Sequence, residues 1–281
     1  MPPLRRFIVA LISMGTGIIP LASESLRQKI DQLESNRRSV GDARELLVLY
    51  IYAGRYAPAA DLARQTSTLV PQDWNLHFNE ALCRMAARDP AVDRAWRDLD
   101  LSSAEVPPGP RWKDLEKLAR TASSGGWGPE EDAAWMEQIR QMYHGHGWYT
   151  ACLLIDIYQV WGNPQERLFL RKIRADVLLR AGWPDEALTL WKQLYRETGE
   201  EYCLYEQARC YRKMGDPVAT WGLLTGIRSP DLKKFPFYFL LCETGKTLGF
   251  PSERMAPYFT AALAAAGNEA EKGRILTLQG K

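Results

Sequence analysis

The chain has 281 residues, of which 46% are hydrophobic and 25% are charged, an ordinary globular composition that is long enough for a large core. The formal net charge is +2, so the overall charge does not point to nucleic acid as a partner. The cysteines are scattered without any CxxC pair, which excludes a disulfide framework and a cysteine metal site and is typical of small buried hydrophobic residues. They are Cys83, Cys152, Cys203, Cys210 and Cys242.

Residues 1–25 have the pattern of an export signal. A positive start at Arg5 and Arg6 precedes an uncharged apolar run from Phe7 to Ala22, and small residues suited to cleavage follow. The run is short for a membrane span, which needs roughly 20 apolar residues. We therefore expect a periplasmic or secreted protein. The alternatives are an inner-membrane anchor, with residues 1–22 as a membrane tether, and a buried first helix.

The segment 40–73 has the pattern of two antiparallel helices joined by a tight turn. Asp42 is expected to cap the first helix, and Gly54 ends it. Ala59 lies five residues after Gly54, where a bulky side chain would push the two helices apart, and Pro71 closes the unit.

The middle of the chain carries a weaker pattern. A second hairpin is expected over residues 74–99, in which Asp89-Pro90 replaces the turn glycine. Several prolines interrupt any helix in the segment 101–128, which we interpret as a linker with a short helix. A further helix starts at Pro129, because proline favours the first helical position, and a turn at residues 144–147 connects it to the next helix.

The clearest repeat lies between residues 168 and 266. Gly182, Gly215 and Gly249 are 33 and 34 residues apart, and each lies between two helical runs. A period of about 34 residues with two helices per unit is typical of a stacked solenoid of helical hairpins. A final helix over residues 268–278 is expected to cap the exposed end of the stack.

Over residues 40–73 and 168–200, and less closely over 201–266, the chain resembles the tetratricopeptide repeat. The resemblance rests on the period, on the turn glycine, and on a small residue five positions after it, as at Ala59 and Ala187. It implies an all-α, right-handed solenoid of antiparallel helical hairpins behind an N-terminal signal or anchor segment. The expected divisions are a signal or anchor at 1–25, N-terminal repeats at 26–100, a linker with a short helix at 101–128, and C-terminal repeats with a capping helix at 129–281.

In this family the first helix of each hairpin lines a concave groove, so the resemblance maps particular positions onto that surface. The predicted peptide-binding residues are Phe169, Lys172, Arg180, Tyr202, Tyr205, Arg209, Arg212, Lys213, Phe239 and Lys246. Such a basic and aromatic surface suits an extended acidic segment or a C-terminal carboxylate, although a solvated helix face can have the same composition. The family's carboxylate clamp requires asparagine at the ninth position of the repeat, where this chain has Asp176, Arg209 and Glu243.

Catalytic and metal-binding motifs were sought along the whole sequence. His144 and His146 lie in a glycine-flanked turn, but there is only one other histidine and no HExxH pattern, so a polar turn is the simpler interpretation. GxSxG, P-loop and GxGxxG motifs are absent. We therefore expect no enzyme activity, no cofactor and no metal.

These patterns together predict a non-catalytic scaffold or adaptor at the bacterial cell envelope that binds a protein or peptide partner and no nucleic acid. Two other classes stay open at this point. One is a self-assembling structural subunit of an envelope machine, and the other is a helical enzyme that acts on envelope polymers. Nothing in the sequence indicates an oligomeric state.

Overall fold

The computed structural model of the chain describes residues 25–102 and 110–280. These residues form fifteen α-helices and two single-turn 3-10 helices, with no strand among them. The α-helices are α2 (Leu26–Asn36), α3 (Val40–Tyr52), α4 (Tyr56–Ser67), α5 (Trp74–Ala86), α6 (Val92–Leu101), α7 (Pro110–Ser123), α8 (Pro129–His144), α9 (Trp148–Trp161), α10 (Arg167–Arg180), α11 (Pro184–Thr198), α12 (Glu201–Lys213), α13 (Pro217–Gly226), α14 (Phe235–Thr247), α15 (Ser252–Ala265) and α16 (Glu269–Gln279).

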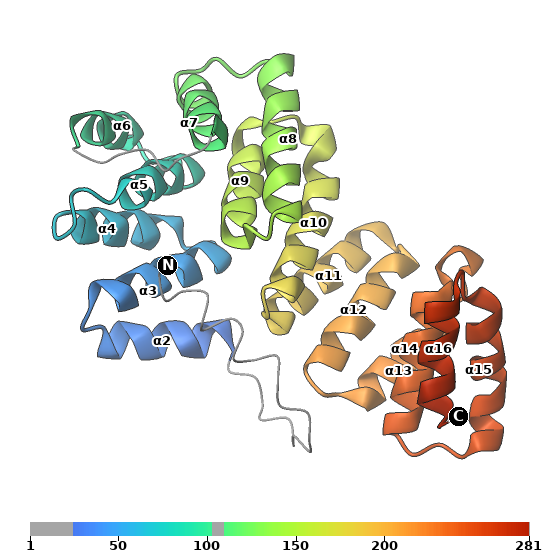
Figure 1. Cartoon of the computed structure of the whole chain (residues 1–281). Coiled ribbons are helices and arrows are strands. Elements are labelled where there is room, and N and C mark those ends of the chain that lie inside the picture. The colour runs from blue at the N-terminus through green and yellow to red at the C-terminus, as the bar shows by residue number, and fades with distance from the viewer. Residues whose placement is uncertain (1–24, 103–109, 281) are drawn as a thin grey trace.

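The helices are arranged as six antiparallel hairpins that follow one another along the chain (Figure 1). The hairpins are α3–α4, α5–α6, α8–α9, α10–α11, α12–α13 and α14–α15. Helix α2 packs in front of the first hairpin, α7 lies between the second and third, and α16 packs on the last. This confirms the predicted all-helical repeat fold. The predicted linker over residues 101–128 contains α7, which packs against α5, α6 and α8.

The predicted export signal, apart from Ser25, lies outside the described residues. Among the helices that the structure does describe, none combines the length and the apolar character that a membrane crossing requires.

All six hairpin turns contain one residue with a left-handed backbone. These residues are Gly54, Arg88, His146, Gly182, Gly215 and Gly249, with φ between 53° and 93°. The residue after each donates its N–H to the carbonyl five positions back, as from Arg55 to Tyr50 at 2.8 Å. This bond closes the end of the first helix in each hairpin. The turn geometry is therefore one repeated unit.

The second turn corrects the sequence-based interpretation. Its left-handed residue is Arg88, which lies 34 positions after Gly54, so Asp89-Pro90 does not replace the glycine. Asp89 has a different role, because its carboxylate accepts the Ala91 N–H at 2.8 Å and bends the chain toward α6. The period thus continues through a residue that is not glycine.

The start of α3 also differs from the prediction. Ser39, and not Asp42, is the N-cap, and its hydroxyl accepts the Asp42 N–H at 3.1 Å. Asp42 lies one turn further on and accepts the Ser39 N–H at 3.0 Å, which completes a capping box. The small residues predicted at the helix crossings are in place, since Ala59 and Ala187 are fully buried.

Helix α9 lies at the centre of the largest part of the core. It packs against α3, α5, α8 and α10, and Leu153, Leu154 and Ile155 in its middle are fully buried. Helix α9 covers one face of α3 and one face of α5. These faces are apolar at the positions that are charged in the groove predicted for the later repeats. Helix α9 therefore fills part of the inner side of the first two hairpins, and a cavity of about 690 Å³ remains there, lined mainly by α3 and α5 with Tyr149 of α9.

A buried ion pair connects α9 and α10 to the first hairpin turn. Arg174 Nε lies 2.7 Å from Asp156 Oδ2, and its Nη2 donates to the Tyr52 carbonyl at 3.2 Å. The Tyr56 hydroxyl also donates to Asp156. Burial, followed by the Asp156 charge, raises the pKa of Tyr56 well above its usual range, so this phenol stays a hydrogen-bond donor. The first hairpin turn, α9 and α10 thus meet at one guanidinium.

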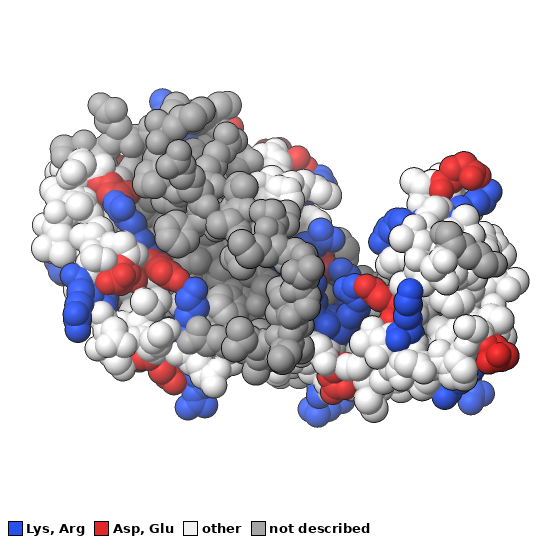
Figure 2. Space-filling model, turned by 60° about the horizontal axis from the view of Figure 1, so that its bottom comes forward, with Lys and Arg blue, Asp and Glu red and all other residues white. Residues whose placement is uncertain are grey.

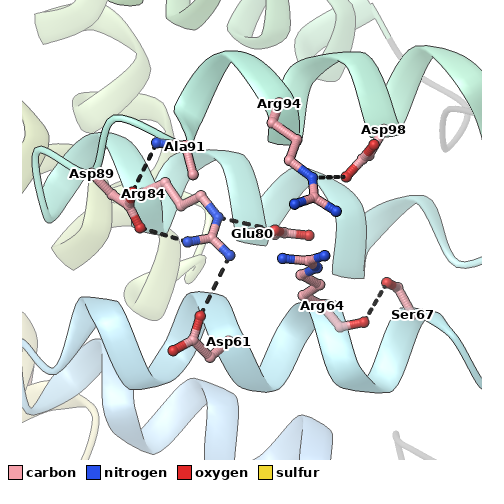
Figure 3. Close-up of polar contacts among 9 residues, drawn as sticks. All are labelled: Asp61, Arg64, Ser67, Glu80, Arg84, Asp89, Ala91, Arg94 and Asp98. Atoms are coloured by element: carbon pink, nitrogen blue, oxygen red, sulfur yellow. Dashed lines mark hydrogen bonds and ion pairs between the residues drawn. The ribbon is translucent and has the colours of Figure 1, made fainter.

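A second buried cluster lies where α4, α5 and α6 meet (Figure 3). Arg84 contacts Glu80 at 3.0 Å, Asp89 at 2.5 Å and Asp61 at 3.4 Å. The side chains of Arg84 and Glu80 are only 6% and 4% exposed. Burial raises the pKa of Glu80 in spite of the neighbouring arginine. The guanidinium therefore offsets only part of the cost of burying the Glu80 carboxylate.

We expect Arg84→Met to destabilise the fold by about 3–5 kcal/mol, because it leaves Glu80 buried without its partner. Glu80→Gln should cost much less, since it removes a charge that burial already disfavours. Urea unfolding of both variants beside the parent protein tests this difference. Equal losses in the two variants would show that Glu80 is as necessary as Arg84.

Candidate functional site

The predicted binding residues lie on α10, α12 and α14, the first helices of the last three hairpins. Half of them line a single cavity of about 320 Å³, namely Tyr205, Arg209, Arg212, Lys213 and Phe239. The rest of its lining is Leu179, Phe235, Pro236, Leu240, Glu243, Glu271 and Arg274. Aromatic side chains and four basic residues thus meet in one concave site.

A second cavity of about 500 Å³ adjoins the first. The two share Arg212, Lys213 and Glu243, and threonine side chains line much of the second. Arg212 and Glu243 form an ion pair at this shared wall. Figure 2 shows a hollow between the C-terminal lobe and the rest of the molecule, with basic and acidic side chains mixed along it. The groove therefore extends beyond one cavity.

The other predicted residues lie outside the lining of this cavity. Phe169 and Tyr202 are 52% and 39% exposed, at the beginnings of α10 and α12. Lys172 pairs with Glu200 at 2.6 Å, and Arg180 pairs with Asp176 at 2.6 Å. Lys246 donates to the Leu278 carbonyl at 2.7 Å, which ties α14 to the end of α16. These basic side chains already have structural partners.

Most of the predicted positive charge is compensated within the groove. Arg209 lies 2.7 Å from the buried Glu206 and 3.5 Å from Asp176, and Arg212 pairs with Glu243. Successive first helices lie side by side, so an acid of one repeat reaches a base of the next. Lys213 and Lys246 are the predicted bases for which the described residues provide no carboxylate, and Lys246 donates instead to a backbone carbonyl. The groove therefore carries less uncompensated positive charge than the number of predicted lysine and arginine residues implies.

Sequence reasoning missed the contribution of α16. Glu271 and Arg274 of this helix form one wall of the first cavity. The Arg274 guanidinium lies 4.2 Å from the centre of the Phe239 ring and 5.8 Å from that of Phe235. The position of Gly280 in the sequence could have revealed the contribution of α16 to the groove. Helix α16 ends at the left-handed Gly280, and Arg274 lies six positions before it.

The position six residues before the left-handed residue also alternates in charge along the groove. From the third hairpin onward, the residue six positions before the left-handed residue is Arg140, Asp176, Arg209, Glu243 and finally Arg274, whereas the first two hairpins have Val48 and Leu82 there. Asp176 contacts Arg209 directly across the repeat boundary. Tyr143 of α8 also donates to Asp176. Burial, followed by this hydrogen bond, raises the pKa of Tyr143 to about 12. Charges of opposite sign therefore follow one another from repeat to repeat.

The histidines do not form a metal site. His146 is a left-handed turn residue whose ring lies edge-on to Trp148, whereas His144 contacts Tyr143. His77 Nε2 lies 3.0 Å from the Pro71 carbonyl oxygen, in another hairpin. Within residues 25–102 and 110–280 there is no group of three or more histidine, cysteine, aspartate or glutamate side chains that could hold an ion. All five cysteines are free and buried.

Glu206 should make stability depend on pH. Burial, opposed by Arg209, raises the pKa of Glu206 above its usual 4.5, so the folded state favours the protonated form. Its stabilising contribution is complete below pH 4.5 and is lost as the pH rises through the folded pKa. Glu206→Gln should therefore gain stability relative to the parent between pH 4 and pH 7, by roughly 1.4 kcal/mol per unit of pKa shift. Urea unfolding at both pH values measures this, and a constant difference would contradict it.

Comparisons with known proteins concern the fold. No protein-family model matches the chain, and no curated protein matches it. Among solved structures, it is similar to the crystal structure of a tetratricopeptide repeat protein from Parabacteroides merdae. The two are 14% identical, the match covers 91% of this chain and 93% of that chain, and the TM-score is 0.46. The repeated hairpins and their left-handed turns agree with the helical-repeat fold predicted from the sequence.

Proposed function

We propose that this protein is a non-catalytic interaction scaffold that binds an extended peptide segment of a partner on the concave face of α10, α12 and α14. The observation that carries the proposal is the cavity into which Tyr205, Phe239 and Leu240 project from two of these helices, with arginine and lysine around it. Aromatic and arginine side chains are enriched in the energetically important parts of protein interfaces.

The shape of the site supports an extended ligand. The first cavity continues into the second across the pair formed by Arg212 and Glu243, so a bound chain could follow the groove over two hairpins. The first cavity alone, at about 320 Å³, is at the small end of the range for ligand pockets. A segment that places one or two side chains in each cavity uses the whole groove.

The N-terminal hairpins are poorer candidates for the same role. Helix α9 already packs on α3 and α5 and occupies part of the corresponding inner face, and the two charged side chains that line the cavity left there, Arg44 and Asp73, pair with each other. A self-assembling subunit, joined end to end, is also less well supported at the C-terminal end, because α16 packs on α14 and α15. The open groove of the C-terminal hairpins is therefore the surface on which we place the partner.

The cell envelope is the location that we propose. The support is the sequence pattern of residues 1–25, with its basic start, apolar run and small residues. Expression of the full chain in a bacterium, followed by fractionation and intact-mass measurement, tests this. We expect a periplasmic species that lacks the N-terminal segment, or an uncleaved species in the inner membrane. A full-length species in the cytosolic fraction would contradict the proposal.

Site-specific photo-crosslinking tests the groove itself. With p-benzoylphenylalanine at Phe239, irradiation in the native host should give a discrete adduct with the partner. Tyr195, 36% exposed on α11 and outside the cavity lining, is the matched control position. Tyr205→Ala should weaken binding by about 2 kcal/mol, or ~30-fold, if the ring anchors the ligand. Equal adducts at the two positions, or none at Phe239, would refute a groove site.

A further inference from the structure

We propose that α16 completes the groove with an anion subsite, in which Lys213 and Arg274 bind a carboxylate of the peptide and the adjoining aromatic cavity holds a neighbouring apolar side chain. This inference rests on the proposed function and specifies the chemistry of the ligand. It assigns a binding role to a terminal helix that otherwise only caps the repeat stack.

The charged side chains around the first cavity differ in whether they already have a partner. Six of them line it, four basic and two acidic. Arg209 is held by Glu206 and Asp176, and Arg212 is held by Glu243. A ligand carboxylate would have to compete with carboxylates that are already in place at both arginines.

Glu271 is the other acidic side chain of the lining, and it too is engaged. Its Oε2 accepts the Gly267 N–H at 2.7 Å, at the beginning of α16. Its own N–H is capped by the Asn268 side chain at 2.9 Å. The carboxylate is therefore directed to the helix terminus, and no ion pair with Arg274 is formed among the described residues.

Lys213 and Arg274 are the other two basic residues of the cavity lining. Lys213 projects from the last turn of α12, and Arg274 projects from α16 on another wall of the same cavity. Neither has a carboxylate partner in the part of the chain that the structure describes. Two uncompensated charges that line one cavity favour an anion between them.

The geometry of Arg274 suits it to this role. The guanidinium stacks over Phe239 at 4.2 Å, so one face is held by the ring while its N–H edges stay available. The supporting helix is fixed by the fully buried Ile275 and by the bond from Lys246 to the Leu278 carbonyl. A pre-oriented planar donor can bind a carboxylate through two parallel hydrogen bonds.

The surrounding apolar surface determines what accompanies the carboxylate. Phe235 and Leu240 are 5% and 6% exposed and form the floor beside Arg274, and Tyr205 lies on the wall from α12. An aromatic or large aliphatic side chain next to the acidic group would fill this space. The ligand motif is thus one carboxylate adjacent to one large apolar side chain, from an internal acidic residue or from a chain terminus.

A peptide array tests this motif with the full chain as the probe. The array holds glycine-serine hexapeptides in which two adjacent positions take every pair of residues, printed both with free and with amidated C-termini. We expect the strongest binding where Asp or Glu adjoins Phe, Tyr or Leu. If the free and amidated series bind equally, the carboxylate is that of a side chain, and a preference for the free series assigns it to the chain terminus.

Variants then separate the subsite from the groove. Arg274→Gln and Lys213→Gln should each weaken the acidic spots about tenfold, as expected for the loss of a charge-assisted hydrogen bond. Arg196→Gln, a charge removed from an exposed position on α11, is the control and should change nothing. Phe239→Ala tests the groove as a whole, and the thermal unfolding of each variant checks that it is folded.

The outcomes distinguish the two proposals. Spots that Phe239→Ala removes but that Arg274→Gln and Lys213→Gln leave within twofold would overturn the anion subsite and leave the groove in place. Spots that Phe239→Ala does not change would overturn both. An array without binding spots, or one whose strongest spots lack acidic residues, would also overturn the anion subsite.

Discussion

The relative position of the two halves of this repeat protein depends on a buried ion pair between Arg174 and Asp156. Arg174 belongs to α10, on which the later hairpins stack, whereas its other contact is the Tyr52 carbonyl in the first hairpin turn. Both side chains are less than a fifth exposed, at 12% and 16%. A charge removed from water in this way is stable only with its partner, so the pair strongly favours one docking geometry.

That docking divides the inner surface of the array into two chemically different parts. On α3 and α5, residues such as Ile51 and Met85 are apolar and buried, and α9 packs on both helices. On α12 and α14, the equivalent positions carry Arg212 and Lys246, and the surface stays open to solvent. Burial of the apolar face against the chain itself follows from the hydrophobic effect, whereas the charged face gains nothing from being covered.

The electrostatics of the open part follow from the stacking of repeats. Side chains at one position of successive first helices become neighbours, and here they alternate in sign from Asp176 through Arg209 and Glu243 to Arg274. Asp176 pairs with Arg209 inside this row, whereas Glu243 pairs with Arg212 one turn away, and these ion pairs use much of the capacity of both arginines for an external anion. Arg274 has no carboxylate partner among the described residues, which leaves uncompensated positive charge near α16.

The sequence by itself determined the hairpin architecture, because a 34-residue spacing of turn residues specifies where helices end and cross. It identified Gly182, Gly215 and Gly249 but overlooked Arg88 and His146, since a left-handed backbone is costly for such residues and only its surroundings impose it. Only the tertiary structure decided which side chains are neutralised. Arg209 is as cationic as Arg274 in the sequence, yet Glu206 of its own helix and Asp176 of another repeat pair with Arg209, whereas Arg274 lies beside Phe239.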